Sequence, residues 1–192
     1  PASAGAPVAA APEQGWSVRR AVWGLVAVGV LLRAWVVLAG WFAGDDYVLQ
    51  GFAWRSDLDP AYLASTPTGE LMPGGLALQW QLAHAFPMDH APIALALILG
   101  QAAALVLFAL LALELWGRRR LAVVPVALVA VSPAALTAGA SWSNALGLLP
   151  FQIALTVLLL GAARWWRTGR LGWLIAGVVL WMPSLAFGSA AL

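Results

Sequence analysis

Two adjacent carboxylates, Asp45 and Asp46, end a long apolar run near the start of this chain. They lie in the stretch GDDYVLQGFAW, 44–54, where aromatic and amide side chains follow the acids. A carboxylate at a membrane–water boundary can act as a general base, and a second acid beside it can orient it or bind a divalent cation such as Mg²⁺ or Mn²⁺. The alternative is structural, because two hydrated acids also mark where a transmembrane helix leaves the membrane.

The residues that follow the acids could form a sugar-binding surface. Aromatic rings and amides suit sugars, so Tyr47, Gln50 and Trp54 are candidates for substrate binding. Arg55, in the same stretch, could attract an anionic head group. The alternative is that Tyr and Trp only anchor the chain at the membrane interface, as they do in many membrane proteins.

Further along the segment, two aspartates and two histidines raise the question of a second metal site. Asp57 and Asp59 have D-x-D spacing, but they stand directly ahead of Pro60, where aspartates commonly begin a turn or cap a helix. His84 and His90 are six residues apart, which does not place both on one helical face. We predict a turn or cap at the aspartates and interfacial positions for the histidines.

Arg33 lies inside the first apolar run, where a charged side chain costs several kcal/mol unless it is paired or reaches water. It could help to hold the phosphate of a lipid-linked substrate or pair with an acid of the following loop. The alternative is a structural partner, or a side chain that extends to the interface. Glu114 lies too far away in depth, and we expect it to pair with Arg118 at i,i+4 instead.

The composition is that of a membrane protein. Of 192 residues, 62% are hydrophobic and 9% are charged, whereas soluble domains carry about 25% charged residues. Cysteine is absent, which excludes disulfides and thiolate chemistry. Lysine is absent as well, and this composition resembles that of a high-GC bacterial gene. The net charge of +2 is small. The sequence does not indicate a basic groove with interleaved aromatic residues, so it does not predict a nucleic-acid partner. No Walker loop, serine-hydrolase order or zinc motif is present.

The apolar runs predict an all-α polytopic transmembrane bundle of about five spans, because about 20 apolar residues suffice to cross the hydrocarbon. Residues 1–17 are Ala- and Pro-rich and predict a disordered tail ahead of a transmembrane domain over 18–192. A first outer loop over 44–91 holds six of the eight acids and should contain short amphipathic interfacial helices, with Leu76, Trp80 and Ala83 at helical spacing. The expected spans are about 21–43, 92–116, 121–139, 145–163 and 171–191.

Three arginine clusters orient this bundle. They fall on one side of the membrane if the five spans alternate: Arg19 and Arg20; Arg118, Arg119 and Arg120; Arg164, Arg167 and Arg170. The positive-inside rule then places the N-terminus in the cytoplasm and the loop 44–91 outside a bacterial inner membrane. The chain starts without Met and stops within an apolar run, so we expect a fragment of a longer protein.

This order of features resembles the C-type glycosyltransferase (GT-C) superfamily of polytopic membrane enzymes. The resemblance rests on the acid pair after the first span and on the Pro-Gly turn in ELMPGGLALQW, 70–80, and it covers roughly 18–192. It implies inverting transfer of a sugar from a polyprenyl-phosphate carrier to a glycan, lipid or protein acceptor, with Asp45 or Asp46 as the general base. Family members differ in whether this motif binds a divalent cation.

Two other classes remain open at this point. A transporter or flippase of a lipid-linked substrate would place Arg33 on the substrate pathway and should show repeats and broken helices. A non-catalytic membrane subunit would use the acids only to set its topology.

Overall fold

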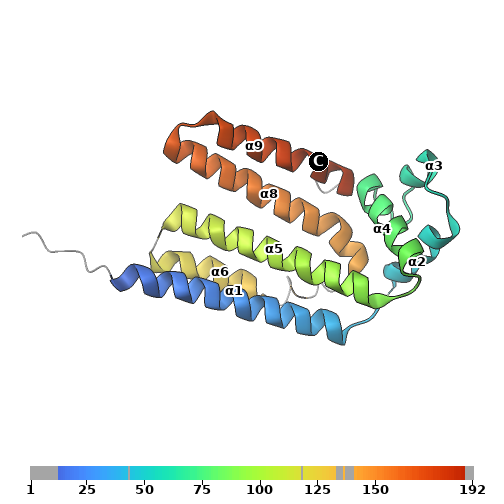
Figure 1. Cartoon of the computed structure of the whole chain (residues 1–192), viewed down its shortest axis with the longest axis horizontal. Helices are drawn as coiled ribbons and strands as arrows, with labels where there is room; N and C mark the ends of the chain where they lie inside the picture. Colours follow the sequence, from blue (N-terminus) through green and yellow to red (C-terminus); the bar gives the residue numbers. More distant parts are fainter. Residues whose placement is uncertain (1–12, 43, 118, 133–135, 137–140, 189–192) are drawn as a thin grey trace, which may run out of the picture.

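The computed structural model of this chain describes residues 13–42, 44–117, 119–132, 136 and 141–188. In this part of the chain every regular element is helical, which confirms the all-α prediction. The long helices lie side by side in an elongated bundle, and a group of shorter helices forms one end of it (Figure 1).

Three helices are long and apolar enough to cross a membrane. They are α1 (Glu13–Ala39), α5 (His90–Trp116) and α8 (Trp142–Thr168), each 27 residues long. At 1.5 Å per residue such a helix is about 40 Å long, which exceeds the roughly 30 Å of a hydrocarbon core. These helices indicate a membrane-embedded protein. Because α1 begins at Glu13, the predicted tail is helical over 13–17, and 1–12 lie outside the described residues.

The other apolar helices are shorter. A 3₁₀ turn, η1 (Arg120–Ala122), leads into α6 (Val123–Val131), and α9 (Leu171–Trp181) continues into a second 3₁₀ segment, η2 (Met182–Phe187). Helix α6 ends at Val131, and its C-cap residue Ser132 is extended because a residue before a proline disfavours the helical conformation. Most of 133–140 lies outside the described residues, so the count of five spans stays a prediction.

The segment between α1 and α5 folds into three helices, α2 (Asp45–Arg55), α3 (Pro60–Leu63) and α4 (Pro73–Ala85). The predicted helix in this segment is therefore confirmed, but its apolar face does not lie on the membrane surface. Leu76 and Ala83 are fully buried in a core shared by the ends of α1, α5 and α8. Helix α4 packs against α2 and η2. The apolar face that we expected on the membrane surface therefore contacts protein instead.

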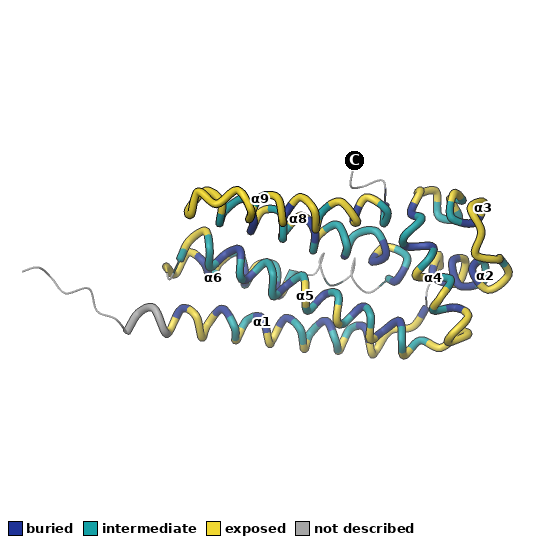
Figure 2. Tube along the Cα trace, turned by 45° about the horizontal axis from the view of Figure 1, so that its top comes forward, coloured by how far each residue is buried: buried dark blue, intermediate teal, exposed yellow. Residues whose placement is uncertain are grey.

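Close backbone approach holds the remaining helices together. A Cβ at Gly161 in α8 would lie 2.5 Å from the carbonyl oxygen of Trp173 in α9. A Cβ at Gly29 in α1 would lie 3.0 Å from the Cβ of Ala130 in α6. Small residues at such contacts are typical of membrane helix pairs, since van der Waals packing replaces the hydrophobic effect there. Outside these contacts α9 is largely exposed (Figure 2).

Arg33 is buried, with 5% of its surface exposed, and its guanidinium group binds backbone carbonyls. It donates to Val129 at 2.7 Å, to Ala130 at 2.8 Å and to Gly29 in its own helix at 3.1 Å. The last carbonyls of α6 have no partner within that helix, and such groups are costly in hydrocarbon. This is structural pairing, with carbonyl oxygens rather than an acid as the partners.

Glu114 pairs with a different residue from the one that its local sequence predicts. Its carboxylate lies 2.9 Å from Nη1 of Arg167, and the same nitrogen donates to the Glu114 backbone carbonyl at 3.2 Å. The pairing forms because the C-terminal ends of α5 and α8 lie at the same end of the bundle (Figure 1). Arg118, the expected i,i+4 partner, lies outside the described residues.

We expect Arg33→Met to lower the free energy of unfolding by about 2–4 kcal/mol, because two buried carbonyls of α6 lose their donors. Arg55→Met is the matched control, since Arg55 is exposed and its Nε bonds only to Gly51 of its own helix. Unfolding of the detergent-solubilised chain, followed by circular dichroism, measures both changes. Equal stability losses in the two variants would contradict this role of Arg33.

Candidate functional site

Asp46 is buried against the start of α8 and caps that helix from a distant part of the chain. With 3% of its surface exposed, it accepts hydrogen bonds from the Ser143 backbone N–H at 2.8 Å and from the Ser141 hydroxyl at 3.2 Å. Ser141 is the N-cap residue of α8 but does not cap the helix with its own side chain. A carboxylate here satisfies a free N–H and complements the helix dipole.

Asp45 has the opposite environment from its neighbour. It is exposed, and it has no hydrogen-bond or ion-pair partner among the described residues. The two acids open α2, where successive side chains point about 100° apart around the helix. Gly44 makes the turn into α2 with φ of +48°, a conformation that favours glycine. The helix therefore leaves Asp45 in water and turns Asp46 into the protein.

The outer side of α2 carries three of the other predicted site residues. Tyr47 and Trp54 are about half exposed, and seven residues separate them, which places both on one stripe of the helix. Arg55 is exposed beside them. The structure therefore brings Asp45, Tyr47, Trp54 and Arg55 to the exposed half of one short helix, where a sugar or an anionic head group could contact them.

Gln50 does not lie on this exposed half. Its amide is 2% exposed and accepts a hydrogen bond from Nε2 of Gln79 in α4, whose own Oε1 accepts from Nε1 of Trp142 in α8. The Nε2 group of Gln50 has no partner within the described part of the chain. The predicted sugar ligand is thus a core residue that ties α2 to two other helices.

Sequence reasoning missed Gln79 and Trp142, although one signal was available. Gln79 lies three residues after Leu76 and four before Ala83, on the apolar face of α4. An amide within such a face must find a partner inside the protein, because burial without a hydrogen bond is costly.

Of the two aspartates after α2, Asp59 has the structural role that its position predicts. Its carboxylate accepts from the Tyr62 N–H at 2.7 Å and caps α3. Tyr62 packs on Phe52 and donates its hydroxyl to the Leu76 carbonyl at 3.0 Å. Burial raises the pKa of Tyr62 to about 12, so this phenol remains a hydrogen-bond donor at neutral pH. Asp57 is exposed.

The histidines pack on aromatic rings at the same end of the molecule. His84 stacks on Trp80 with ring centroids 4.1 Å apart and also approaches Trp54, whereas His90 stacks on Trp41. No group of three or more His, Cys, Asp or Glu that could hold a metal ion occurs among the residues that were described.

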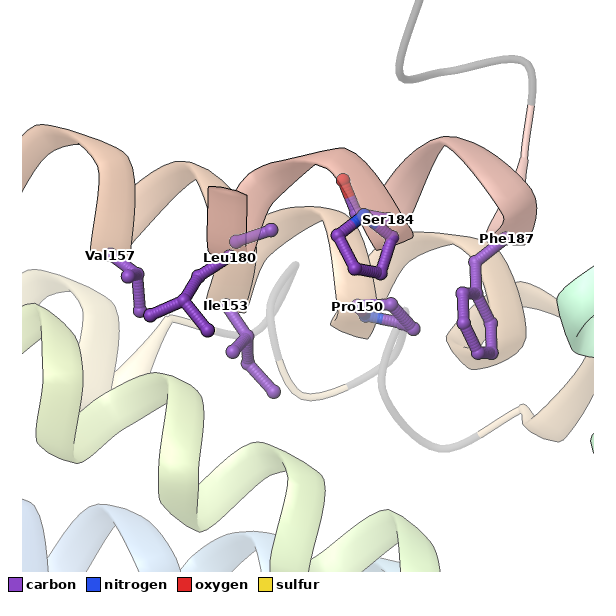
Figure 3. Close-up of a pocket in the computed structure, with 8 residues that line it drawn as sticks. Pro150, Ile153, Val157, Leu180, Ser184 and Phe187 are labelled. Carbon is purple, nitrogen blue, oxygen red and sulfur yellow. The ribbon is translucent and has the colours of Figure 1, made fainter. Parts of the chain in front are cut away.

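An apolar cavity of about 260 Å³ lies elsewhere, between α8 and the end of α9 with η2 (Figure 3). Residues that line it include Pro150, Ile153, Val157, Leu180, Pro183 and Phe187. None of the described residues that line it is titratable, so this cavity offers no acid–base group.

No protein-family model, no curated protein and no solved structure matches this chain.

Proposed function

We propose that this chain belongs to a membrane glycosyltransferase that takes a sugar from a polyprenyl-phosphate carrier, with Asp45 as the general base. The observation that supports this most directly is the pair of environments on α2: Asp45 is exposed and unpartnered within the described residues, beside a buried Asp46. A base must reach the proton that it removes. Asp45 meets this requirement and Asp46 does not.

In the proposed reaction an acceptor hydroxyl lies within hydrogen-bond reach of the Asp45 carboxylate. Asp45 takes the hydroxyl proton while the acceptor oxygen forms a bond to the anomeric carbon of the sugar. The bond between that carbon and the carrier phosphate oxygen breaks, and its electron pair leaves with the polyprenyl phosphate. Attack opposite to the leaving group inverts the anomeric configuration. The acceptor is a glycan, a lipid or a protein.

The remaining residues have supporting roles in this proposal. Asp46 holds the first turn of α2 against α8 and so fixes where Asp45 points. Tyr47 and Trp54 offer rings for a sugar, and Arg55 offers a cation for the carrier phosphate. Arg33 has no place in the reaction, because its recorded hydrogen bonds go to backbone carbonyls.

The proposed setting is a bacterial inner membrane with α2, α3 and α4 outside. The helix ends that carry the arginine clusters lie together at the opposite end of the bundle from these three helices (Figure 1). The positive-inside rule assigns that end to the cytoplasm. A lipid-borne donor would then meet α2 at the outer surface.

A transporter of a lipid-linked substrate is the second candidate, and one observation favours it. Helix α6 stops at Val131, beside the buried Arg33 of α1, and helices that break within the membrane are typical of transporters. In that case Arg33→Met would block substrate movement even in molecules that remain folded, whereas Asp45→Asn would leave it unchanged.

Asp45→Asn should reduce sugar transfer at least 100-fold without changing stability, because an amide cannot accept the hydroxyl proton. The assay presents the full chain in liposomes with a panel of synthetic polyprenyl-phosphate hexoses and pentoses. Asp57→Asn is the matched control, since Asp57 is an exposed acid in the same segment. Transfer by Asp45→Asn at the native rate would overturn the assignment of the base.

Asp46→Ala should instead lower the free energy of unfolding by about 1–2 kcal/mol, since the α8 N-terminus loses its cap. Asp46→Asn should cost less, because an amide oxygen can still accept from the Ser143 N–H. Chemical unfolding in detergent measures both variants against Asp45→Ala, which removes an exposed carboxylate. If Asp45→Ala is as destabilising as Asp46→Ala, the structural role given to Asp46 is wrong.

A further inference from the structure

One end of the bundle carries a concentration of positive charge that the proposed reaction does not use. We call it the basic end, and it comprises seven arginines: Arg19, Arg20, Arg119, Arg120, Arg164, Arg167 and Arg170. They come from the start of α1, the segment around η1, the last turns of α8 and the turn that follows α8, which lie together in Figure 1. Among the described side chains at this end, Glu114 is the single acid.

Protein contacts account for only part of this charge. Arg167 pairs with Glu114, and the guanidinium of Arg164 lies 4.7 Å from the centre of the Trp173 ring. Four exposed arginines have no side-chain hydrogen bond or ion pair within the described part of the chain: Arg19, Arg119, Arg120 and Arg170. These four cations are available to an anionic partner from outside the described fold.

One end of each of the three helices long enough to span a membrane lies at the basic end. If these helices span the membrane, the arginines stand where the hydrocarbon stops, at the depth of lipid headgroups. Four partly or largely exposed tryptophans ring the same end, as is typical of a membrane interface: Trp116, Trp165, Trp166 and Trp173. Gly169, at φ of +66°, makes the tight turn that brings Arg170 close behind the end of α8.

We propose that the basic end binds the headgroups of anionic phospholipids. Guanidinium groups match phosphate through paired hydrogen bonds, and arginine supplies every cation of this surface. Basic clusters next to transmembrane helices are attracted to anionic lipids. The surface therefore selects the anionic lipids of its leaflet, whatever reaction the opposite end performs.

The test compares phosphatidylglycerol with phosphatidylcholine of identical acyl chains. The full chain in detergent is mixed with equal amounts of both lipids, and native mass spectrometry counts the lipids that remain bound. We expect phosphatidylglycerol to be retained about tenfold more than phosphatidylcholine, with a preference that falls as salt concentration rises. Equal retention of the two lipids by the native chain would overturn the proposal.

The triple variant Arg119→Gln/Arg120→Gln/Arg170→Gln should reduce this preference by roughly tenfold. The matched control is Arg119→Lys/Arg120→Lys/Arg170→Lys, because it changes the same three side chains but keeps their positive charge and should retain most of the preference. Circular dichroism verifies that each variant keeps its helix content. If the triple variant fails to fold, Arg170→Gln and Arg120→Gln are measured singly, and each should lower the preference severalfold. If the folded variants retain the native preference for phosphatidylglycerol, the basic end does not select anionic lipids.

Discussion

A helix that ends in or beside hydrocarbon must find partners for its terminal backbone groups, and this constraint shapes the whole molecule. Three charged side chains meet it. Arg33 binds the last carbonyls of α6, Arg167 binds a carbonyl in the last turn of α5, and Asp46 binds an N–H in the first turn of α8. Cations serve the C-terminal ends and the anion serves the N-terminal end, as the helix dipole favours. A chain with few charges thus uses several of them to satisfy the backbone groups at helix ends.

The long helices were predictable because a long apolar run in a membrane can satisfy its backbone only as a helix. The partners of the charged residues in these helices were not predictable from the sequence. Arg33 binds carbonyls 96 and 97 residues away, and a carbonyl leaves no trace in the amino-acid sequence. The i,i+4 rule paired Glu114 with the arginine that follows its own helix, yet Glu114 pairs with Arg167 of α8. Only the packing of α5 beside α8 decides between them.

The sequence grouped most of the candidate site residues in one segment, but it did not show which of their side chains are exposed. Helix α2 carries apolar residues around its whole circumference, with Leu49 buried and Val48 half exposed, so periodicity did not reveal which side faces the core. Gln50 was therefore expected on a sugar-facing surface, whereas its amide lies between α2 and α4. A buried hydrogen-bond network can turn a polar side chain inward when packing gives it a partner.

The exposure of Asp45 follows from the burial of Asp46. Neighbouring residues at the start of a helix point about 100° apart, so one of two adjacent acids can reach the end of α8 only if the other turns away from it. The bond between Asp46 and Ser143 fixes the rotation of α2, and the buried amide of Gln50, one turn later on the same face, holds that rotation. A single acid at this position could either cap α8 or face water. The pair does both, which means that the two aspartates cannot substitute for one another even though they are chemically identical.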